Sequence, residues 1–169
     1  MPHGELTRLY DAHASGLFAF LLNFTRDEGR TRDVMQEVFL RLARRPSLMQ
    51  GVVDERAFLL RLAHNLAVDA SRRTDVRRRA HAALAEEAPD LFVAEPDADS
   101  AAVGREISAA LGELPPEQRA VVQLKIWEGR TFESVGDVLG IPANTAASRY
   151  RYAMEKLRVR LRGLREAIR

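Results

Sequence analysis

The chain has 169 residues, of which 46% are hydrophobic and 30% are charged, and its net charge is only +2. This balance is typical of a soluble protein with one ordinary domain or two small ones. The absence of cysteine excludes disulfides, thiolate metal sites and a cysteine nucleophile. The longest strongly apolar stretch, residues 17–24, is far too short to cross a bilayer. Because no secretory signal pattern begins the chain, a cytoplasmic protein is expected.

The first half of the chain predicts three amphipathic helices. Apolar residues recur every three or four positions over residues 6–24, and residues 25–29 break the pattern. Thr31 is the expected N-cap of a second helix. Asp54, which follows a loop over residues 46–53, is the expected N-cap of a long third helix. The residues expected to face inward on the second and third helices are Val34, Met35, Val38, Phe39, Leu42, Phe58, Leu59, Leu62, Ala63, Leu66 and Ala70.

A segment of different composition follows these helices. Residues 81–104 lose the helical spacing, and residues 86–99 contain six acids and no base. Such a segment has too few large apolar side chains to pack, and its charges repel one another. We therefore predict an all-α fold of two small helical domains, residues 1–80 and 105–169, joined by a flexible acidic linker.

The second half again predicts short helices. Helical spacing resumes at Ile107, and the sequence LPPE at residues 114–117 combines a helix stop with a helix start. Gly129 ends the helix that follows. Thr131 is the expected N-cap of the next helix, and Gly140 is expected to end it.

The last helix carries the stretch NTAASRYRYAMEKLR, residues 144–158. With the preceding short helix and the turn at residues 140–142, it forms a helix-turn-helix pattern, in which the second helix enters the major groove of DNA. Asn144 suits the start of this helix, and the small residues after it let the backbone approach DNA closely. Hydroxyl, guanidinium and aromatic groups then alternate, and they contact phosphates or bases. The candidate DNA-binding residues are Thr145, Ser148, Arg149, Tyr150, Arg151 and Tyr152.

The distribution of charge also favours nucleic-acid binding. Residues 41–79 contain ten arginines against four acids, and residues 149–169 contain seven arginines and Lys156 against two glutamates. An alternative is an exposed helix whose arginines are only solvated and whose tyrosines pack on the core. The density of arginine beside a three-helix pattern favours DNA binding over that alternative.

An ordered set of motifs resembles a known family. DVMQEVFLRL at residues 33–42, AFLLRLAHNLAVD at residues 57–69 and the pair Arg72-Arg73 resemble the first conserved domain of bacterial sigma factors. The parts that resemble the second conserved domain are Leu111 to Leu114, Arg119 and Thr131 to Leu161. Since it combines these two domains with a linker, the chain is similar to the extracytoplasmic-function group of the sigma-70 family.

The resemblance implies a protein that binds core RNA polymerase and promoter DNA and promotes transcription initiation. The second domain would bind the double-stranded −35 element, and many relatives carry a basic residue at the positions of Ala147 and Tyr152. Which bases this chain reads therefore stays open. The first domain would bind the melted −10 element, and its loop would hold an unpaired base. The residues implied in −10 binding are Leu48, Met49, Asn65, Asp69, Arg72 and Arg73.

Phe58 has two possible roles. The family usually has tryptophan at this position, and Phe58 keeps the apolar bulk but lacks the indole donor. It would help Leu48 and Met49 to contact an unpaired base, or it would serve as an aromatic residue of the core.

The polar edge formed by Asp33, Gln36 and Glu37 on the second helix is, by resemblance, the contact with the largest polymerase subunits. From the residues alone, a solvated helix face is the simpler interpretation. The acidic linker would thread near the active-site channel of the polymerase, or it would act only as a spacer. An anti-sigma factor is a further partner that the resemblance leaves open.

Two other functions compete with this interpretation. A stand-alone helix-turn-helix regulator would explain residues 105–169, but it would leave the first domain and the linker without a role. An enzyme would need a chemical site. The four histidines lack metal-ligand spacing, and no phosphate-binding glycine loop or nucleophile elbow occurs. The pair Asp33 and Glu37 lacks further metal ligands nearby. We therefore expect no enzymatic activity, catalytic residue, metal or cofactor.

Overall fold

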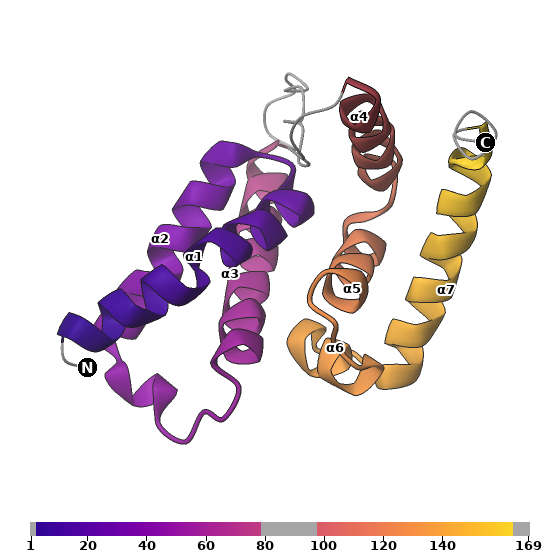
Figure 1. The fold of residues 1–169 in the computed structure, drawn as a ribbon. Coiled ribbons are helices and arrows are strands. Elements are labelled where there is room, and N and C mark those ends of the chain that lie inside the picture. Colours follow the sequence, from indigo (N-terminus) through magenta and orange to yellow (C-terminus); the bar gives the residue numbers. More distant parts are fainter. Residues whose placement is uncertain (1–2, 79–97, 164–169) are drawn as a thin grey trace. The chain divides into compact units, whose positions relative to one another are not determined.

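The computed structural model describes residues 3–78 and 98–163. These ranges are helical and contain no β-strand, which confirms the predicted all-α fold (Figure 1). The chain divides into two compact units, one containing α1 to α3 and the other containing α4, α5 and α7. The elements are α1 (His3–Thr25), α2 (Glu28–Arg44), the 3-10 helix η1 (Pro46–Met49), α3 (Glu55–Arg78), α4 (Ala98–Gly112), α5 (Pro116–Ile126), α6 (Phe132–Leu139) and α7 (Ala143–Arg160).

The first unit is a three-helix bundle in which α1 packs against both α2 and α3. Its buried apolar side chains are aliphatic apart from Phe20 and Met35. A leucine, valine or phenylalanine side chain that is fully buried stabilises the fold by roughly 1.5–3 kcal/mol. Phe39 lies at the edge of this core, where its ring meets that of Tyr10 edge-on at a centroid distance of 4.9 Å. The core residues that are completely buried are Leu9, Leu17, Phe20, Leu21, Val38, Leu42, Leu59, Leu60 and Ala63.

The start of α2 differs from the prediction. The N-cap is Asp27, whose Oδ1 accepts a hydrogen bond of 2.9 Å from the backbone N–H of Arg30. Thr31 lies inside the helix, is completely buried and donates its hydroxyl to the Asp27 carbonyl at 2.8 Å. Arg26, with a φ of 56°, makes the sharp bend between α1 and α2. Asp27 can cap the helix because this bend ends α1 immediately before it, whereas Thr31 is needed in the core.

The start of α3 confirms the predicted cap. Asp54 accepts a hydrogen bond of 2.8 Å from the backbone N–H of Ala57, and its carbonyl accepts one of 3.0 Å from Phe58. The loop before it contains η1 and a left-handed turn at Gly51, where φ is 72°.

The second unit begins earlier than the apolar spacing predicts. Helix α4 starts at Ala98 and not near Ile107, so residues 98–104 of the predicted linker are helical. This stretch is rich in alanine, which has the highest helix propensity, but it has no apolar stripe by which a pattern would detect it. Residues 81–97 of the predicted linker lie outside the described residues.

The core of the second unit joins α4, α5 and α7. Arg119 is buried within this unit, and its Nη2 donates a hydrogen bond of 3.0 Å to the carbonyl of Leu114. The arginine thereby ties α5 to the turn that follows α4. The buried residues of this core are Ala110, Leu111, Leu114, Val122, Ala153 and Leu157.

Candidate nucleic-acid interface

Helices α6 and α7 form the predicted helix-turn-helix. Thr131 caps α6, since its hydroxyl oxygen accepts a hydrogen bond of 3.2 Å from the Ser134 N–H. Gly140 ends α6 in the left-handed conformation, with φ 68° and ψ 37°, which strongly favours glycine. Ile141 then donates its N–H to the carbonyl of Gly136 at 3.0 Å. Helix α7 begins at Ala143, so Asn144 lies in its first turn and does not cap it.

Gly136 allows the close approach of the turn. A Cβ atom at this position would lie 2.6 Å from the carbonyl oxygen of Ile141 and 3.4 Å from the nitrogen of Ala143. Both are backbone atoms, so no side-chain rotation can relieve the clash. The turn therefore requires glycine inside α6, although glycine is a poor helix former.

We expect Gly136→Ala to destabilise the helix-turn-helix by about 1–3 kcal/mol, because the added methyl group pushes the turn away from α6. Thermal unfolding of the full chain, followed by circular dichroism, measures this loss. Gly163→Ala is the matched control, since a Cβ atom there meets nothing within 4 Å. Equal melting curves for the two variants would contradict the close contact.

One face of α7 packs into the unit, and the opposite side presents polar groups. Ala146, Ala153 and Leu157 are buried. Thr145, Ser148 and Tyr152 follow one another at intervals of three and four residues, which places them on one side of the helix. Tyr150 is partly buried, and its ring meets that of Phe132 edge-on at a centroid distance of 5.7 Å.

The two arginines among the candidate −35 residues have different surroundings. Arg149 is partly buried, and its Nη2 lies 2.7 Å from Oε2 of Glu117 at the start of α5. Arg151 is exposed, and its guanidinium carbon lies 5.3 Å from the ring centroid of Tyr152. A pair of a cation and an aromatic ring can meet both phosphates and bases. Arg149 is thus pre-positioned by a carboxylate, whereas Arg151 extends into solvent.

A second polar helix face lies on α3. The candidate −10 residues Asn65, Asp69, Arg72 and Arg73 are all exposed. Their intervals of three and four residues place them on one side of α3, opposite the buried Ala63 and Ala67. Two of the four are arginines at the end of this stripe, where the face carries a local positive charge.

The loop between α2 and α3 carries apolar groups at the start of the same helix. Leu48 is exposed, Met49 is partly buried, and Phe58 lies below the guanidinium of Arg61, which is 5.8 Å from its ring centroid. Val53 was not predicted as a site residue, yet it is 99% exposed. Its place in the sequence could have indicated this exposure. Val53 lies between Gly51 and the N-cap Asp54, outside any helical pattern that would place it in the core.

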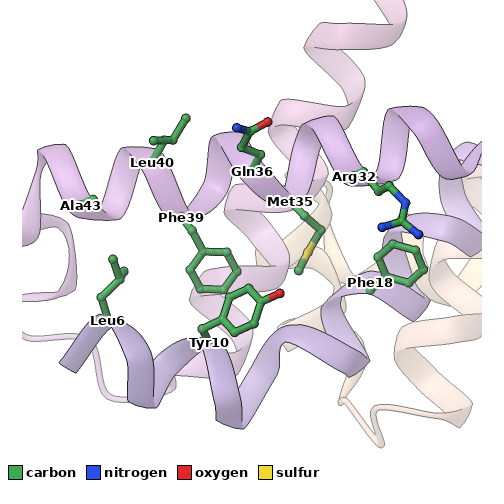
Figure 2. A pocket seen from close by; sticks show the side chains of 9 residues that line it. All are labelled: Leu6, Tyr10, Phe18, Arg32, Met35, Gln36, Phe39, Leu40 and Ala43. Carbon is green, nitrogen blue, oxygen red and sulfur yellow. The ribbon is translucent and has the colours of Figure 1, made fainter. Parts of the chain in front are cut away.

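The polar edge predicted on α2 borders an apolar groove (Figure 2). Asp33 and Gln36 are exposed, and Glu37 accepts a hydrogen bond of 2.9 Å from Arg41. The groove has a volume of about 510 Å³ and lies between α1 and α2. The rings of Tyr10, from α1, and Phe39, from α2, meet edge-on within it (Figure 2). Its lining residues are Leu6, Tyr10, Phe18, Arg32, Met35, Gln36, Phe39, Leu40 and Ala43.

The second unit has an apolar groove of its own on α4, α5 and α7. Ile126 and Trp127 are its exposed apolar members, at 48% and 44%, and the exposed Arg158 and Arg162 also line it. The other lining residues are Ile107, Leu111, Val122, Met154, Leu157 and Leu161.

Residues 3–78 and 98–163 hold no group of three or more histidine, aspartate or glutamate side chains that could bind a metal ion. In these two ranges, no helix combines the length and the apolar character that crossing a membrane requires.

A helix-turn-helix with a cationic second helix, accompanied by a separate helical unit with a polar and basic helix face, defines a DNA-binding protein of two helical units. Comparison with known proteins gives the class. Residues 9–77 match the family described as Sigma-70 region 2, and residues 110–159 match Sigma-70, region 4. The two matches fall on the two units, in the same order along the chain.

Relatives and a solved structure extend these matches over nearly the whole chain. The ECF RNA polymerase sigma factor SigL of Mycobacterium tuberculosis is 33% identical over 92% of this chain and 88% of its own. SigX of Bacillus subtilis is 27% identical over 95% and 85%. The fold is also that of the sigma factor RpoE of Bartonella quintana, solved in complex with the anti-sigma factor NepR, with a TM-score of 0.74, 18% identity and coverage of 94% and 95%.

The chain belongs to the extracytoplasmic-function group of the sigma-70 family. It is an RNA polymerase sigma factor for transcription initiation, a class that binds core RNA polymerase and promoter DNA. The alternative of a stand-alone helix-turn-helix regulator is thereby excluded.

Proposed function

We propose that the two units divide promoter recognition between two exposed helix faces. Helix α7 binds the double-stranded −35 element, and α3 with the preceding loop binds the melted −10 element. The observation that carries this proposal is that each unit presents one polar, arginine-bearing helix face opposite its own buried core. Two weak contacts on one polymerase reinforce each other, because binding of the first raises the effective concentration of the second.

At the −35 element, the amino-terminal half of α7 enters the major groove. Thr145 and Ser148 contact phosphates or base edges, and Arg149 and Arg151 pair with phosphate or guanine. Tyr152 adds stacking or apolar contact on the same side. Tyr150, which is partly buried against Phe132, acts mainly by supporting the helix.

At the −10 element, α3 and the loop act on separated strands. Asn65 and Asp69 supply hydrogen bonds, and Arg72 and Arg73 neutralise phosphates. Leu48 and Met49 give an unpaired base the apolar contact that replaces its lost stacking. The exposed side chain of Val53 adds to that contact.

The polar edge of α2, Asp33, Gln36 and Glu37, together with the groove beside it, docks on core RNA polymerase. Charged groups at the border give orientation, and the apolar groove supplies burial. A protein with this role works where the polymerase works, in the cytoplasm. The complex of RpoE with NepR makes an anti-sigma factor a candidate partner for this chain as well.

In this proposal, residues 1–80 form the domain that binds polymerase and the −10 element, and residues 105–169 form the domain that binds the −35 element. Residues 81–104 are the acidic linker between them. The linker has six acids between residues 86 and 99 and no base, so it would compete with nucleic acid for a basic channel. Because α4 begins at Ala98, the last residues of that segment are helical.

Reconstituted transcription tests the proposal. We expect the purified chain with core polymerase to give start-site-specific run-off transcripts from some members of a genomic promoter library. On a selected promoter, Arg72→Ala with Arg73→Ala should reduce transcripts, and a pre-melted −10 region should restore part of the loss. Transcripts that ignore scrambling of both promoter elements would contradict promoter recognition by these two faces.

A further inference from the structure

The first residues of α3 are attached to α1 by a group of polar contacts. Arg8 binds Glu55 through both guanidinium ends, with distances of 2.6 Å from Nη2 to Oε1 and 3.1 Å from Nη1 to Oε2. Nε2 of His13 lies 3.4 Å from Oε2 of Glu55. The hydrogen bond from Arg8 holds the pKa of Glu55 below its usual value. Arg56 donates from Nη1 to the backbone carbonyl of His13 at 3.2 Å.

Gly16 completes this arrangement. A Cβ atom at Gly16 would lie 2.6 Å from Nη2 of Arg56 and 3.2 Å from its Cζ. The guanidinium therefore lies directly on the backbone of α1, in the space that any side chain at this position would occupy. Glycine within a helix costs roughly 1 kcal/mol relative to alanine. At Gly16 this loss is offset because the missing side chain lets the Arg56 guanidinium approach α1.

These contacts lie next to the loop that precedes α3. Residues 54–56 follow the loop directly, and Asp54 caps the helix in which Glu55 and Arg56 form the first turn. At the other end, Arg45 donates its N–H to the carbonyl of Arg41, and Leu48 donates to the carbonyl of Arg45 at 3.1 Å. The second half of the loop contains Gly51, in the left-handed conformation, and the exposed Val53. Its position thus depends on where the start of α3 is fixed.

Stability alone does not explain the arrangement. Arg8 and Glu55 are partly open to solvent, and ion pairs of this kind contribute little to folding. The core of the bundle already joins α1 to α3 through residues such as Leu17 and Leu59. The polar contacts add orientation. A bidentate ion pair and a second arginine fix the angle of the first turn of α3 and its position along α1.

We propose that Arg8, His13, Gly16, Glu55 and Arg56 form a clamp that positions the loop at residues 46–53 for recognition of the −10 element. This inference rests on the proposed function of the loop. The clamp residues are positioning residues: they determine −10 specificity through the loop, since a recognition group must be held within about 0.5 Å by its support. The prediction for the clamp is therefore a loss of −10 discrimination without a loss of folding.

Gly16→Ala is the sharpest test of the clamp. The new methyl group displaces only the end of the Arg56 side chain, which is flexible, and alanine strengthens α1. The melting temperature should therefore stay the same or rise. Gly4→Ala is the matched control: it makes the same substitution in the same helix, where a Cβ atom meets nothing within 4 Å.

The assay uses the full chain with core polymerase and a promoter selected by run-off transcription. Open-complex formation, measured by permanganate reactivity, is compared on the intact −10 element and on one with single-base substitutions. We expect Gly16→Ala to reduce the preference for the intact element about tenfold, as for the loss of one stacked base. Core binding and the preference for the intact −35 element should not change. Gly4→Ala should match the wild type in every measurement.

Glu55→Gln provides a second and independent variant, because it weakens the bond to Arg8 without changing the volume of the side chain. It should reduce −10 preference in the same direction as Gly16→Ala. Leu48→Ala distinguishes a failure of the clamp from a failure of the proposed loop function. If Leu48→Ala alters −10 preference and both clamp variants keep the wild-type preference, the clamp is wrong while the loop function stands. If Leu48→Ala also leaves the preference unchanged, the proposed function of the loop is wrong.

Discussion

Replacing Arg149 by alanine should weaken binding of the holoenzyme to a −35 duplex by about 1–3 kcal/mol, if the guanidinium reads a base, and should relax the preference at one promoter position. The structure supports a direct role because Glu117 holds Nη2 of this arginine at 2.7 Å, which leaves other N–H groups of the fork to bind DNA. A planar group held from one side loses less freedom on binding than a solvated one.

A salt series separates base contact from phosphate contact. If Arg149 binds phosphate, Arg149→Ala should weaken binding evenly on intact and scrambled −35 elements, and the salt slope should fall by about one. Arg162→Ala should behave only in this second way or have no effect. Wild-type affinity and salt slope for Arg149→Ala on every DNA would mean that α7 does not enter the groove as proposed.

Glu117→Gln provides a further comparison at the same contact. It removes a negative charge near DNA, so affinity for all sequences should rise, while the preference for the intact −35 element should fall because Arg149 is no longer oriented. A rise in both the affinity and the preference for the intact −35 element would indicate that Glu117 competes with DNA for Arg149 and does not orient it.

Leu40→Glu should reduce affinity for core RNA polymerase by about tenfold or more, since a charged group would then have to be desolvated at the docking surface. Leu40 is 38% exposed and lines the groove between α1 and α2, beside the polar edge of Gln36. Leu40→Met keeps the apolar character and should bind core polymerase normally. Circular dichroism should show unchanged helix content for both variants, because the side chain is not part of the buried core.

Wild-type core binding by Leu40→Glu would exclude the groove as the docking surface. In that case Asp33→Ala with Gln36→Ala tests whether the polar edge acts alone. Normal binding by this variant as well would leave α2 as a solvated face, which is the simpler interpretation of its residues.

Most of the fold could be predicted because most of the helices carry a local signal of their own. The apolar spacing on α1 to α3, the proline pair before α5 and the glycine after α6 are local patterns, and they correspond to helices with the expected order. The starts of α2 and α4 were predicted wrongly, and both errors have a physical cause. Residues 98–104 at the start of α4 have no apolar stripe, so no pattern marks them as helical. At α2, Asp27 and Thr31 were both able to cap, and the bend at Arg26 decided between them.

The candidate site could be predicted only in part, because its geometry depends on contacts between distant residues. The sequence predicts six neighbouring positions on α7 as one DNA-binding set, but the helix turns Tyr150 toward Phe132 and lets Arg151 extend outward. The pairing of Arg149 with Glu117 joins α7 to α5, and no local spacing reveals it. For the same reason the groove between α1 and α2 was not foreseen, since it exists only where two helices pack.

The single tryptophan of the chain gives the second unit an intrinsic optical reporter. Trp127 is 44% exposed at the border of the groove on α4, α5 and α7, so its fluorescence responds to any partner that covers this face. The first unit contains no tryptophan and is silent in the same measurement. With a partner that contains no tryptophan, such as promoter DNA, a rapid-mixing experiment on unlabelled protein can therefore show whether and when that partner covers this face.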